Sequence, residues 1–342
     1  MAKKTRKKSK TKKNPKVKPL VNRSIGVLHT GTKIIFEGLV ERMRKSAEQW
    51  LRTHGHPLDT VSIDSGGHYA EDNIGVLESH ADLLVNNTGV PVIVAAGGPQ
   101  SALAAMEATM EADQTREDTP VVFTTVADPV ALGLVDDLLK PGANLTGMAG
   151  QTSENDPKRL RILKALVSPS RPLEKRVGVL INRRRQGFQK HFLDLKIEAN
   201  KPGVKLKLKV RRAKDLIGIQ NAFAEFKNKG YLGVVVTADA FFNNIRKQII
   251  KEAELRLIPT IYQWRSFVEE GGLISYGPSI EEAYEKAGEY AGRILLGEKP
   301  ASMPCSTPTS TPTLFVKQST AMSLGLWPVL PTLDGEPVNV IT

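Results

Sequence analysis

From about residue 24 onward, the apolar positions of this chain alternate between two periodicities. Short continuous apolar runs are typical of strands that are buried on both faces of a parallel sheet. Between these runs, apolar residues recur every three or four positions, which predicts amphipathic helices. The strands are expected at 25–28, 60–63, 91–96, 121–125, 144–148, 177–181, 204–210, 233–237, 259–262, 274–278 and 314–316. The helices are expected at 36–47, 74–84, 102–109, 130–139, 160–166, 188–195, 219–226, 245–253 and 283–295.

This alternation predicts an α/β fold with parallel sheets and right-handed crossovers. The pattern restarts after Met148, and 342 residues are enough for two domains with a core each. We therefore expect two Rossmann-like lobes around a cleft. Several extended segments would cross between the lobes.

The stretch from Pro120 to Gly150 is the centre of this organisation. A buried strand is followed by Asp128-Pro129, then by a helical pattern through Val130 and Leu134 that Pro141-Gly142 ends. With the extended piece after Asn144, it is predicted to be one βαβ unit. Ligands of open α/β sheets bind in the loops at the carboxyl ends of the strands.

Three such loops of the first half carry candidate binding residues. Gly97 and Gly98 allow close approach at a helix start, where backbone amides and the Ser101 hydroxyl can hold a carboxylate. Two glycines before a helix are also simply what a tight turn needs. Asp128 can pair with a ligand ammonium, or serve as a helix N-cap followed by a proline at the first position. The candidates in this half are His29, Thr30, Gly31, Gly97, Gly98, Ser101, Asp128 and Pro129.

The net charge of +12 is concentrated in the first 23 residues, which hold eleven Lys or Arg and no acid. The remaining 37 basic residues nearly balance the 36 acidic ones. Such a tail is predicted to be disordered and solvated, with at most non-specific affinity for nucleic acid or an anionic surface. No apolar segment follows it, so the chain as written shows no secretion signal and reads as cytoplasmic. The single cysteine, Cys305, cannot form an intrachain disulfide, so it does not indicate a redox compartment.

Several motifs, taken in order, resemble the solute-binding component of ABC uptake systems, in the tryptophan/tyrosine-type branch. The resemblance covers roughly residues 24 to 330. The motifs are Gly97-Gly98-Pro99, Pro120-Val121-Val122-Phe123, Asp128-Pro129-Val130, Gly133-Leu134-Val135, residues 140–147, Lys158-Arg159-Leu160, Leu163-Lys164, residues 267–279 and residues 294–301.

The resemblance implies a type I periplasmic-binding fold whose two lobes close on a small, amino-acid-like solute, with an aromatic one as a candidate. It implies delivery to an ABC permease and an extracytoplasmic location, and we expect a monomer. Lobe 1 would be 24–148 plus about 279–303, and lobe 2 would be 149–278 plus about 304–342. The family places four residues of the second lobe beside the cleft. An aromatic solute would stack on Phe241 or Tyr276. The alternative for Phe241 is a place in the core. The four are Asn182, Asp239, Phe241 and Tyr276.

Three features depart from the family pattern. The basic tail stands where a signal peptide or lipidation site is usual. Arg183-Arg184-Arg185 replaces a proline-containing turn, and the segment from Pro312 to Ala321 looks shorter than the corresponding strand. These departures leave open a second hypothesis, a cytosolic sensor that uses the same cleft and contacts nucleic acid or a partner through its tail.

Enzyme classes find no support in the sequence. It contains no G-x-S-x-G, H-E-x-x-H, P-loop lysine or complete G-x-G-x-x-G motif. The six histidines are scattered, and His54-Gly55-His56 has no cysteine or carboxylate at ligand spacing. We therefore expect no catalytic residues, no metal and no cofactor.

Overall fold

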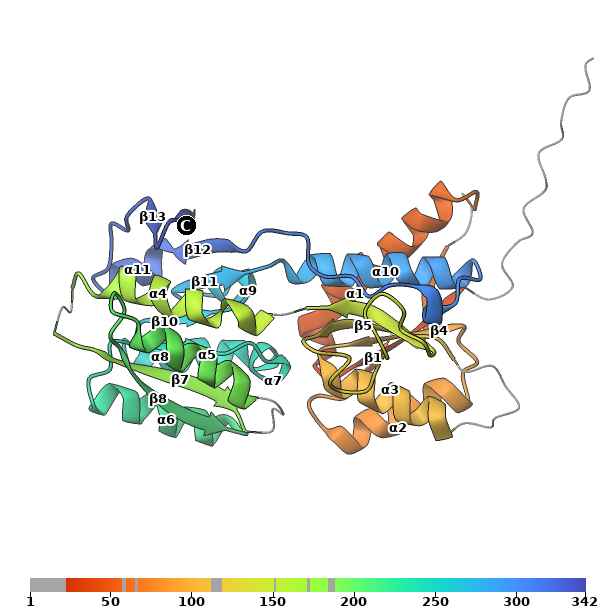
Figure 1. The fold of residues 1–342 in the computed structure, drawn as a ribbon, viewed down its shortest axis with the longest axis horizontal. Helices are drawn as coiled ribbons and strands as arrows, with labels where there is room; N and C mark the ends of the chain where they lie inside the picture. Colours follow the sequence, from red (N-terminus) through yellow and green to blue (C-terminus); the bar gives the residue numbers. More distant parts are fainter. Residues whose placement is uncertain are drawn as a thin grey trace, which may run out of the picture.

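The computed structural model describes residues 23–56, 60–64, 67–111, 119–150, 152–170, 173–183 and 188–342. These residues form two α/β lobes that lie next to each other (Figure 1). Within the described ranges, none of the helices combines the length and the hydropathy that crossing a membrane requires. The N-terminal tail to residue 22 and most of the arginine run after Asn182 lie outside the described residues.

The first lobe is built on a six-stranded sheet with the order β2-β1-β4-β5-β6, in which β3 also pairs with β1. All its strand pairs are parallel. Its strands are β1 (Ser24–His29), β2 (Ser62–Ile63), β3 (His68–Tyr69), β4 (Val92–Ala96), β5 (Val121–Val126) and β6 (Leu145–Ala149). One face packs on α1 (Lys33–Thr53) and α10 (Ile280–Leu295), and the other on α2 (Ile74–Asn86) and α3 (Pro99–Glu111).

The second lobe has an eight-stranded sheet with the order β13-β14-β12-β11-β10-β9-β7-β8. Its strands are β7 (Arg176–Asn182), β8 (Lys207–Ala213), β9 (Gly233–Val236), β10 (Thr260–Tyr262), β11 (Ile274–Gly277), β12 (Thr313–Lys317), β13 (Thr332–Leu333) and β14 (Glu336–Ile341). Its helices are α4 (Asp156–Val167), α5 (Phe188–Asn200), α6 (Leu216–Asn228), α7 (Ala240–Asn244), α8 (Arg246–Leu255), α9 (Arg265–Glu269) and α11 (Gln318–Ser323). One core lies on the side of α4 and another on the side of α6 and α8.

The predicted helix between β5 and β6 is wrong, because residues 127–144 form turns. Asp128 accepts a hydrogen bond from the backbone N–H of Ala131, and Asp137 accepts from those of Leu139 and Lys140. Gly133 adopts a φ of +69°, which interrupts any helix. These local side-chain bonds compete with the helical hydrogen-bond ladder. The segment still buries Leu134, whose exposed fraction is 1%.

The two sheets are mainly parallel, as expected, but two strand pairs at the end of the chain are antiparallel. β12 pairs antiparallel with β11, and β13 pairs antiparallel with β14. The strand expected at 314–316 is present as β12, whereas β13 and β14 were not predicted. Asp334 and Gly335 connect the latter two strands with φ values of +52° and +81°, as a two-residue hairpin turn requires. This Asp-Gly pair was the signal that could have revealed the hairpin.

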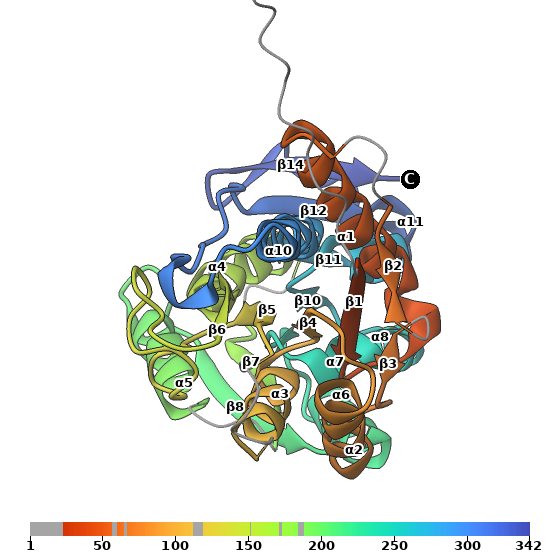
Figure 2. The ribbon, with the colours of Figure 1, turned by 90° about the vertical axis from the view of Figure 1, so that its right-hand side faces the viewer.

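Helix α10 crosses close to α1, although more than 200 residues separate them (Figure 2). The close approach depends on Gly288 and Gly292 of α10. A Cβ atom on Gly288 would lie 2.1 Å from the carbonyl oxygen of Met43, and one on Gly292 would lie 3.1 Å from that of Ala47. Only a residue without a side chain fits at Gly288.

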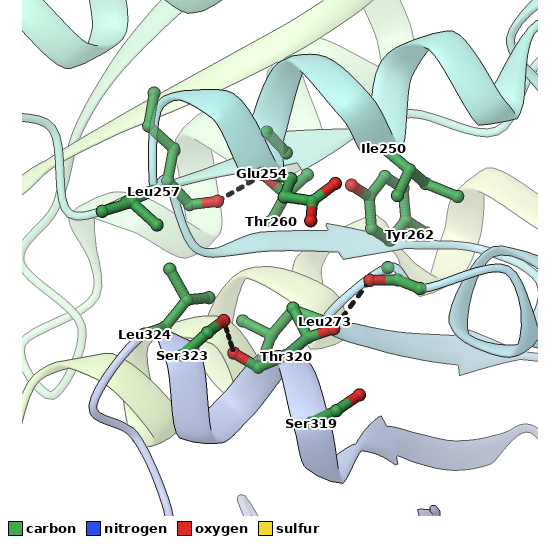
Figure 3. A pocket seen from close by; sticks show the side chains of 14 residues that line it. Ile250, Glu254, Leu257, Thr260, Tyr262, Leu273, Ser319, Thr320, Ser323 and Leu324 are labelled. Atoms are coloured by element: carbon green, nitrogen blue, oxygen red, sulfur yellow. Dashed lines mark hydrogen bonds between the residues drawn. The ribbon is translucent and has the colours of Figure 1, made fainter.

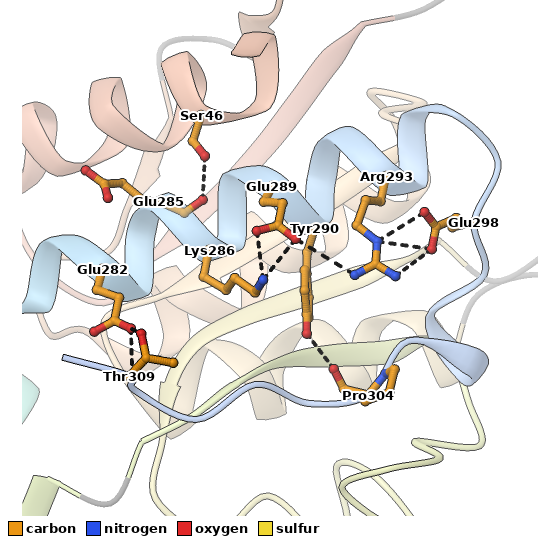
Figure 4. A network of polar contacts seen from close by, with 10 residues as sticks. All are labelled: Ser46, Glu282, Glu285, Lys286, Glu289, Tyr290, Arg293, Glu298, Pro304 and Thr309. Carbon is orange, nitrogen blue, oxygen red and sulfur yellow. Dashed lines mark hydrogen bonds and ion pairs between the residues drawn. The ribbon is translucent and has the colours of Figure 1, made fainter. Parts of the chain in front are cut away.

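The chain passes between the lobes three times: between β6 and α4, between β11 and α10, and between residue 302 and β12. Figure 4 shows how α10 holds the third passage. The carboxylate of Glu282 accepts hydrogen bonds from the backbone and hydroxyl of Thr309 at 2.7 and 2.6 Å and from the backbone of Ser310 at 3.1 Å. The Tyr290 hydroxyl donates to the carbonyl oxygen of Pro304 at 2.5 Å.

Candidate functional site

The loops after β1 and β4 meet at the carboxyl edge of the first sheet, because these two strands are parallel neighbours. The Thr30 hydroxyl donates to the carbonyl oxygen of Gly97 at 2.8 Å, which ties the two loops together. A Cβ atom on Gly97 would lie 2.3 Å from that hydroxyl oxygen, and Gly97 and Gly98 have φ values of +86° and +114°. Glycine is therefore required at Gly97 by both space and backbone conformation.

His29 lies beneath these loops, with no exposed surface. Its Nδ1 accepts a hydrogen bond from the backbone N–H of Gly31 at 2.8 Å, so the proton of the neutral ring is on Nε2, which faces the Tyr284 hydroxyl at 2.7 Å. Burial lowers the pKa of His29 to about 3. The imidazole is thus neutral, and its bond to the Gly31 N–H holds the loop after β1 in place.

Ser101 and Asp128 occupy different environments at this edge. Ser101 is fully buried, and its hydroxyl donates to the carbonyl oxygen of Gly98 at 2.8 Å, which stabilises the start of α3 from inside. Asp128 is exposed, and one carboxylate oxygen accepts from the N–H of Ala131 at 3.0 Å. That bond resembles an N-cap, but a turn with the buried Pro129 follows it instead of a helix.

In the second lobe, Asn182 and Asp239 come together after β7 and β9. The Asn182 amide donates to Asp239 at 2.9 Å, and Asp239 accepts from the backbone N–H of Phe241 at 2.9 Å, which caps α7. Phe241 is half-buried, whereas Phe242 is in the core with an exposed fraction of 1%. Of the two rings, Phe241 is the one with surface left for a ligand.

Tyr276 lies apart from this group. Its ring belongs to the core on the side of α4, together with Leu314 and Val316 of β12. Burial and the nearby carboxylate of Glu336 raise its pKa. Phe241 is therefore better placed than Tyr276 for stacking on an aromatic solute.

Asn244, at the end of α7, connects the two lobes directly, and it was not among the predicted site residues. Its side-chain oxygen accepts hydrogen bonds from the backbone N–H and the hydroxyl of Thr32, both at 3.2 Å. Its side-chain nitrogen donates to the carboxylate of Asp72. Nearby, a Cβ atom on Gly98 would lie 3.4 Å from the Cβ of Ala240. The loops at the carboxyl ends of β1 and β4 thus face the loop after β9.

A hollow of 190 Å³ lies elsewhere, between α8, the start of β10 and α11 (Figure 3). Two of its hydroxyl groups bond within the protein: Thr320 donates to the carbonyl oxygen of Gly271 at 2.8 Å, and Ser323 donates to that of Thr320 at 2.9 Å. It lies at the amino end of β10, away from the loops that face across the lobes. In the part of the chain that the structure describes, no group of three or more His, Cys, Asp or Glu side chains is arranged to hold a metal.

Comparisons with known proteins agree with this architecture. The structure of an ABC domain in complex with L-Trp from Streptococcus pneumoniae aligns with a TM-score of 0.74 at 22% identity, over 93% of this chain and 100% of that one. A ligand-free, open substrate-binding protein with adhesive properties from Clostridium difficile aligns with a TM-score of 0.60 at 24% identity, over 94% and 99%. These matches confirm the periplasmic-binding-protein-like fold that the sequence resemblance implied.

The sequence comparisons identify the family. The tyrosine-binding protein of Clostridioides difficile (strain R20291) is 26% identical over 294 residues, which cover 83% of this chain and 76% of that protein. The family model described as ABC transporter substrate binding protein matches residues 66–327, well over half of the chain. The chain therefore belongs to the ABC transporter substrate-binding protein family, as the solute-binding component of an ABC uptake system and not as an enzyme.

Proposed function

We propose that this protein binds an amino-acid-like solute with an aromatic side chain between its two lobes. The observation that carries the proposal is the meeting of the loops across the lobes, where Asn244 bonds to Thr32 and Gly98 approaches Ala240. Ligands of open α/β sheets bind at the carboxyl ends of strands, and here two such edges face each other. The two related proteins whose descriptions name tyrosine and L-Trp support the choice of solute class.

The two edges offer complementary chemistry to such a solute. In lobe 1, the exposed carboxylate of Asp128 suits an α-ammonium group, and the backbone N–H groups around the start of α3, at Gly98 and Gln100, suit an α-carboxylate. In lobe 2, the half-buried ring of Phe241 offers a stacking face for the side chain. Pro129, Thr30 and Gly31 line the same edge, whereas His29 and Ser101 position the loops, and Asn182 orients Asp239.

Binding is proposed to close the lobes about the three passages. In this division, lobe 1 comprises 24–148 and about 279–303, and lobe 2 comprises 149–278 and about 304–342. The solute first contacts one lobe, and closure brings the other onto it, so the closed form is what an ABC permease would recognise. The bonds of Asn244 to Thr32 and Asp72 would stabilise that form.

Isothermal titration calorimetry of the full chain with L-phenylalanine, L-tyrosine and L-tryptophan tests the solute class. The variant Asp128→Asn keeps the acceptor for the Ala131 N–H but loses the charge. It is expected to weaken binding by about 10- to 100-fold, the usual effect of losing a hydrogen bond to a charged group. Asp137→Asn is the matched control, since Asp137 lies in the same connection and also accepts backbone bonds. It should bind like the parent protein.

The outcomes separate two parts of the proposal. If none of the three amino acids binds the parent protein, the proposed solute class is wrong. If one binds and Asp128→Asn binds it equally well, the solute class stands and the position of the ammonium group is wrong.

A further inference from the structure

Gln263 carries an unusual buried side chain directly after β10. Its exposed fraction is 3%, and neither its Oε1 nor its Nε2 has a hydrogen-bond partner among the residues that the structure describes. Buried polar groups nearly always find partners, because leaving an amide unpaired is costly. Other unpartnered buried atoms in the described chain include the single hydroxyl groups of Tyr69, Thr124 and Ser275. Gln263 lacks partners for both a donor and an acceptor.

The strand register places Gln263 at the carboxyl edge of the second sheet. Ile261 of β10 pairs with Val235 of β9, and Tyr262 pairs with Ser275 of β11. One step further along, Gln263 is in line with Thr237 of β9, two residues before Asp239. This is the edge whose neighbouring loop carries Phe241 and contacts lobe 1 through Asn244.

A second unpartnered amide oxygen lies at the same edge. The Oδ1 atom of Asn243, next to Asn244 on α7, has no partner among the described residues, and the exposed fraction of Asn243 is 3%. Two buried amides with unused hydrogen-bonding capacity thus flank the loop after β9. A group with this capacity at a binding edge is suited to a ligand atom that supplies the missing partner.

We propose that Gln263 determines specificity by binding the hydrogen-bonding group on the aromatic side chain of the solute. The proposal rests on the proposed function, in which lobe 1 holds the ammonium and carboxylate groups and lobe 2 receives the side chain. An indole N–H donates to Oε1, and a phenol hydroxyl either donates to Oε1 or accepts from Nε2. A phenyl ring does neither and leaves the buried amide unpaired. The site therefore selects tyrosine or tryptophan over phenylalanine.

Gln263→Met tests the proposal because methionine matches glutamine in length but has no amide. The parent protein should bind L-tyrosine or L-tryptophan at least about 10-fold more tightly than L-phenylalanine, and the variant should lose that preference. Without ligand, the variant should unfold at the same or a higher temperature, because it buries no unpaired amide. Gln263→Leu should behave in the same way and covers the case in which methionine packs poorly.

Thr260→Val is the control at the other end of the same strand. The Thr260 hydroxyl is buried and donates to the carbonyl oxygen of Ile258 at 3.0 Å. Its loss should lower the unfolding temperature without changing the preference among the three amino acids. Gln263→Met should therefore change selectivity without loss of stability, whereas Thr260→Val should lower stability without changing selectivity.

Three results would overturn the proposal. In the first, the parent protein binds phenylalanine as tightly as the other two. In the second, Gln263→Met keeps the preference. In the third, the Gln263 variants lose as much ligand-free stability as Thr260→Val, which would give Gln263 a structural role. Any of these leaves the proposed function intact, whereas a parent protein that binds none of the three amino acids overturns both.

Discussion

The buried imidazole of His29 should make the stability of this protein depend on pH in a way that one substitution removes. His29 has no exposed surface, and it packs against the rings of Phe36, Tyr69 and Tyr284. No carboxylate contacts it in the described structure, and burial lowers its pKa from 6.5 to about 3. The unfolded chain therefore takes up a proton near pH 6.5 that the folded chain does not accept until about pH 3.

The sign and size of the effect follow from this difference. The stabilisation is fully present above pH 6.5 and is lost as the pH falls toward 3. Each pH unit in this range lowers the free energy of unfolding by about 1.4 kcal/mol. Lowering the pH from 7.5 to 5 should therefore reduce it by about 2 kcal/mol through His29 alone.

The assay is urea unfolding of the parent protein and of His29→Gln at pH 7.5 and pH 5. The other ionisable groups are common to both proteins, so their contributions cancel in the comparison. The parent should lose about 2 kcal/mol more than the variant between the two pH values. Equal losses in the two proteins would refute the reasoning, because they would mean that His29 takes up its proton in the folded state too.

Two further predictions concern the packing of α10. Gly288→Ala should lower the free energy of unfolding by at least about 2 kcal/mol, because the new methyl group meets the carbonyl oxygen of Met43. Gly38 lies on α1 with open space around it, so Gly38→Ala should instead raise the free energy of unfolding by about 0.5–1 kcal/mol. Denaturant titration measures the two free energies, and equal effects of the two substitutions would contradict the packing argument. Burial of Glu282 tends to raise its pKa, but the hydrogen bonds from Ser310 and Thr309 outweigh burial and lower it. The contribution of Glu282 to stability is therefore present above pH 4.5 and lost as the pH falls below that value. Glu282→Gln should lower the free energy of unfolding by about 1–2 kcal/mol at pH 7 and by much less at pH 3. A difference between parent and variant that does not change with pH would contradict this prediction.

The sequence predicted the fold where apolar periodicity was strong, and it failed where local polar bonds decided the structure. Runs such as Val92–Ala96 lie in the sheets as expected. The helical spacing of Val130 and Leu134 was misleading, because Asp128 and Asp137 bond to nearby backbone groups and residues 127–144 form turns. Spacing alone does not reveal such competition.

In the candidate site, too, some residues could be predicted from the sequence and others could not. The loop glycines and Asp128 could be found because they follow strands directly. Asn244 and Gln263 could not, because their significance depends on contacts between distant segments and on the absence of partners in the described structure. A glutamine after a short strand carries no signal until its surroundings are known.

The position of α10 has a consequence for how the chain acquires its structure. During synthesis from the N-terminus, all the strands of the first sheet and α1 are available once residue 149 has been made, but α10, the second helix on the same face, begins only at Ile280. The ribosome must therefore produce most of the second lobe before Gly288 can meet Met43. Contacts between such distant residues form slowly, since the intervening chain must be brought together first. Until α10 is made, the nascent first lobe lacks the helix that packs on β4 and β5 near Val94 and Val122, which makes this part of the face a target for a chaperone.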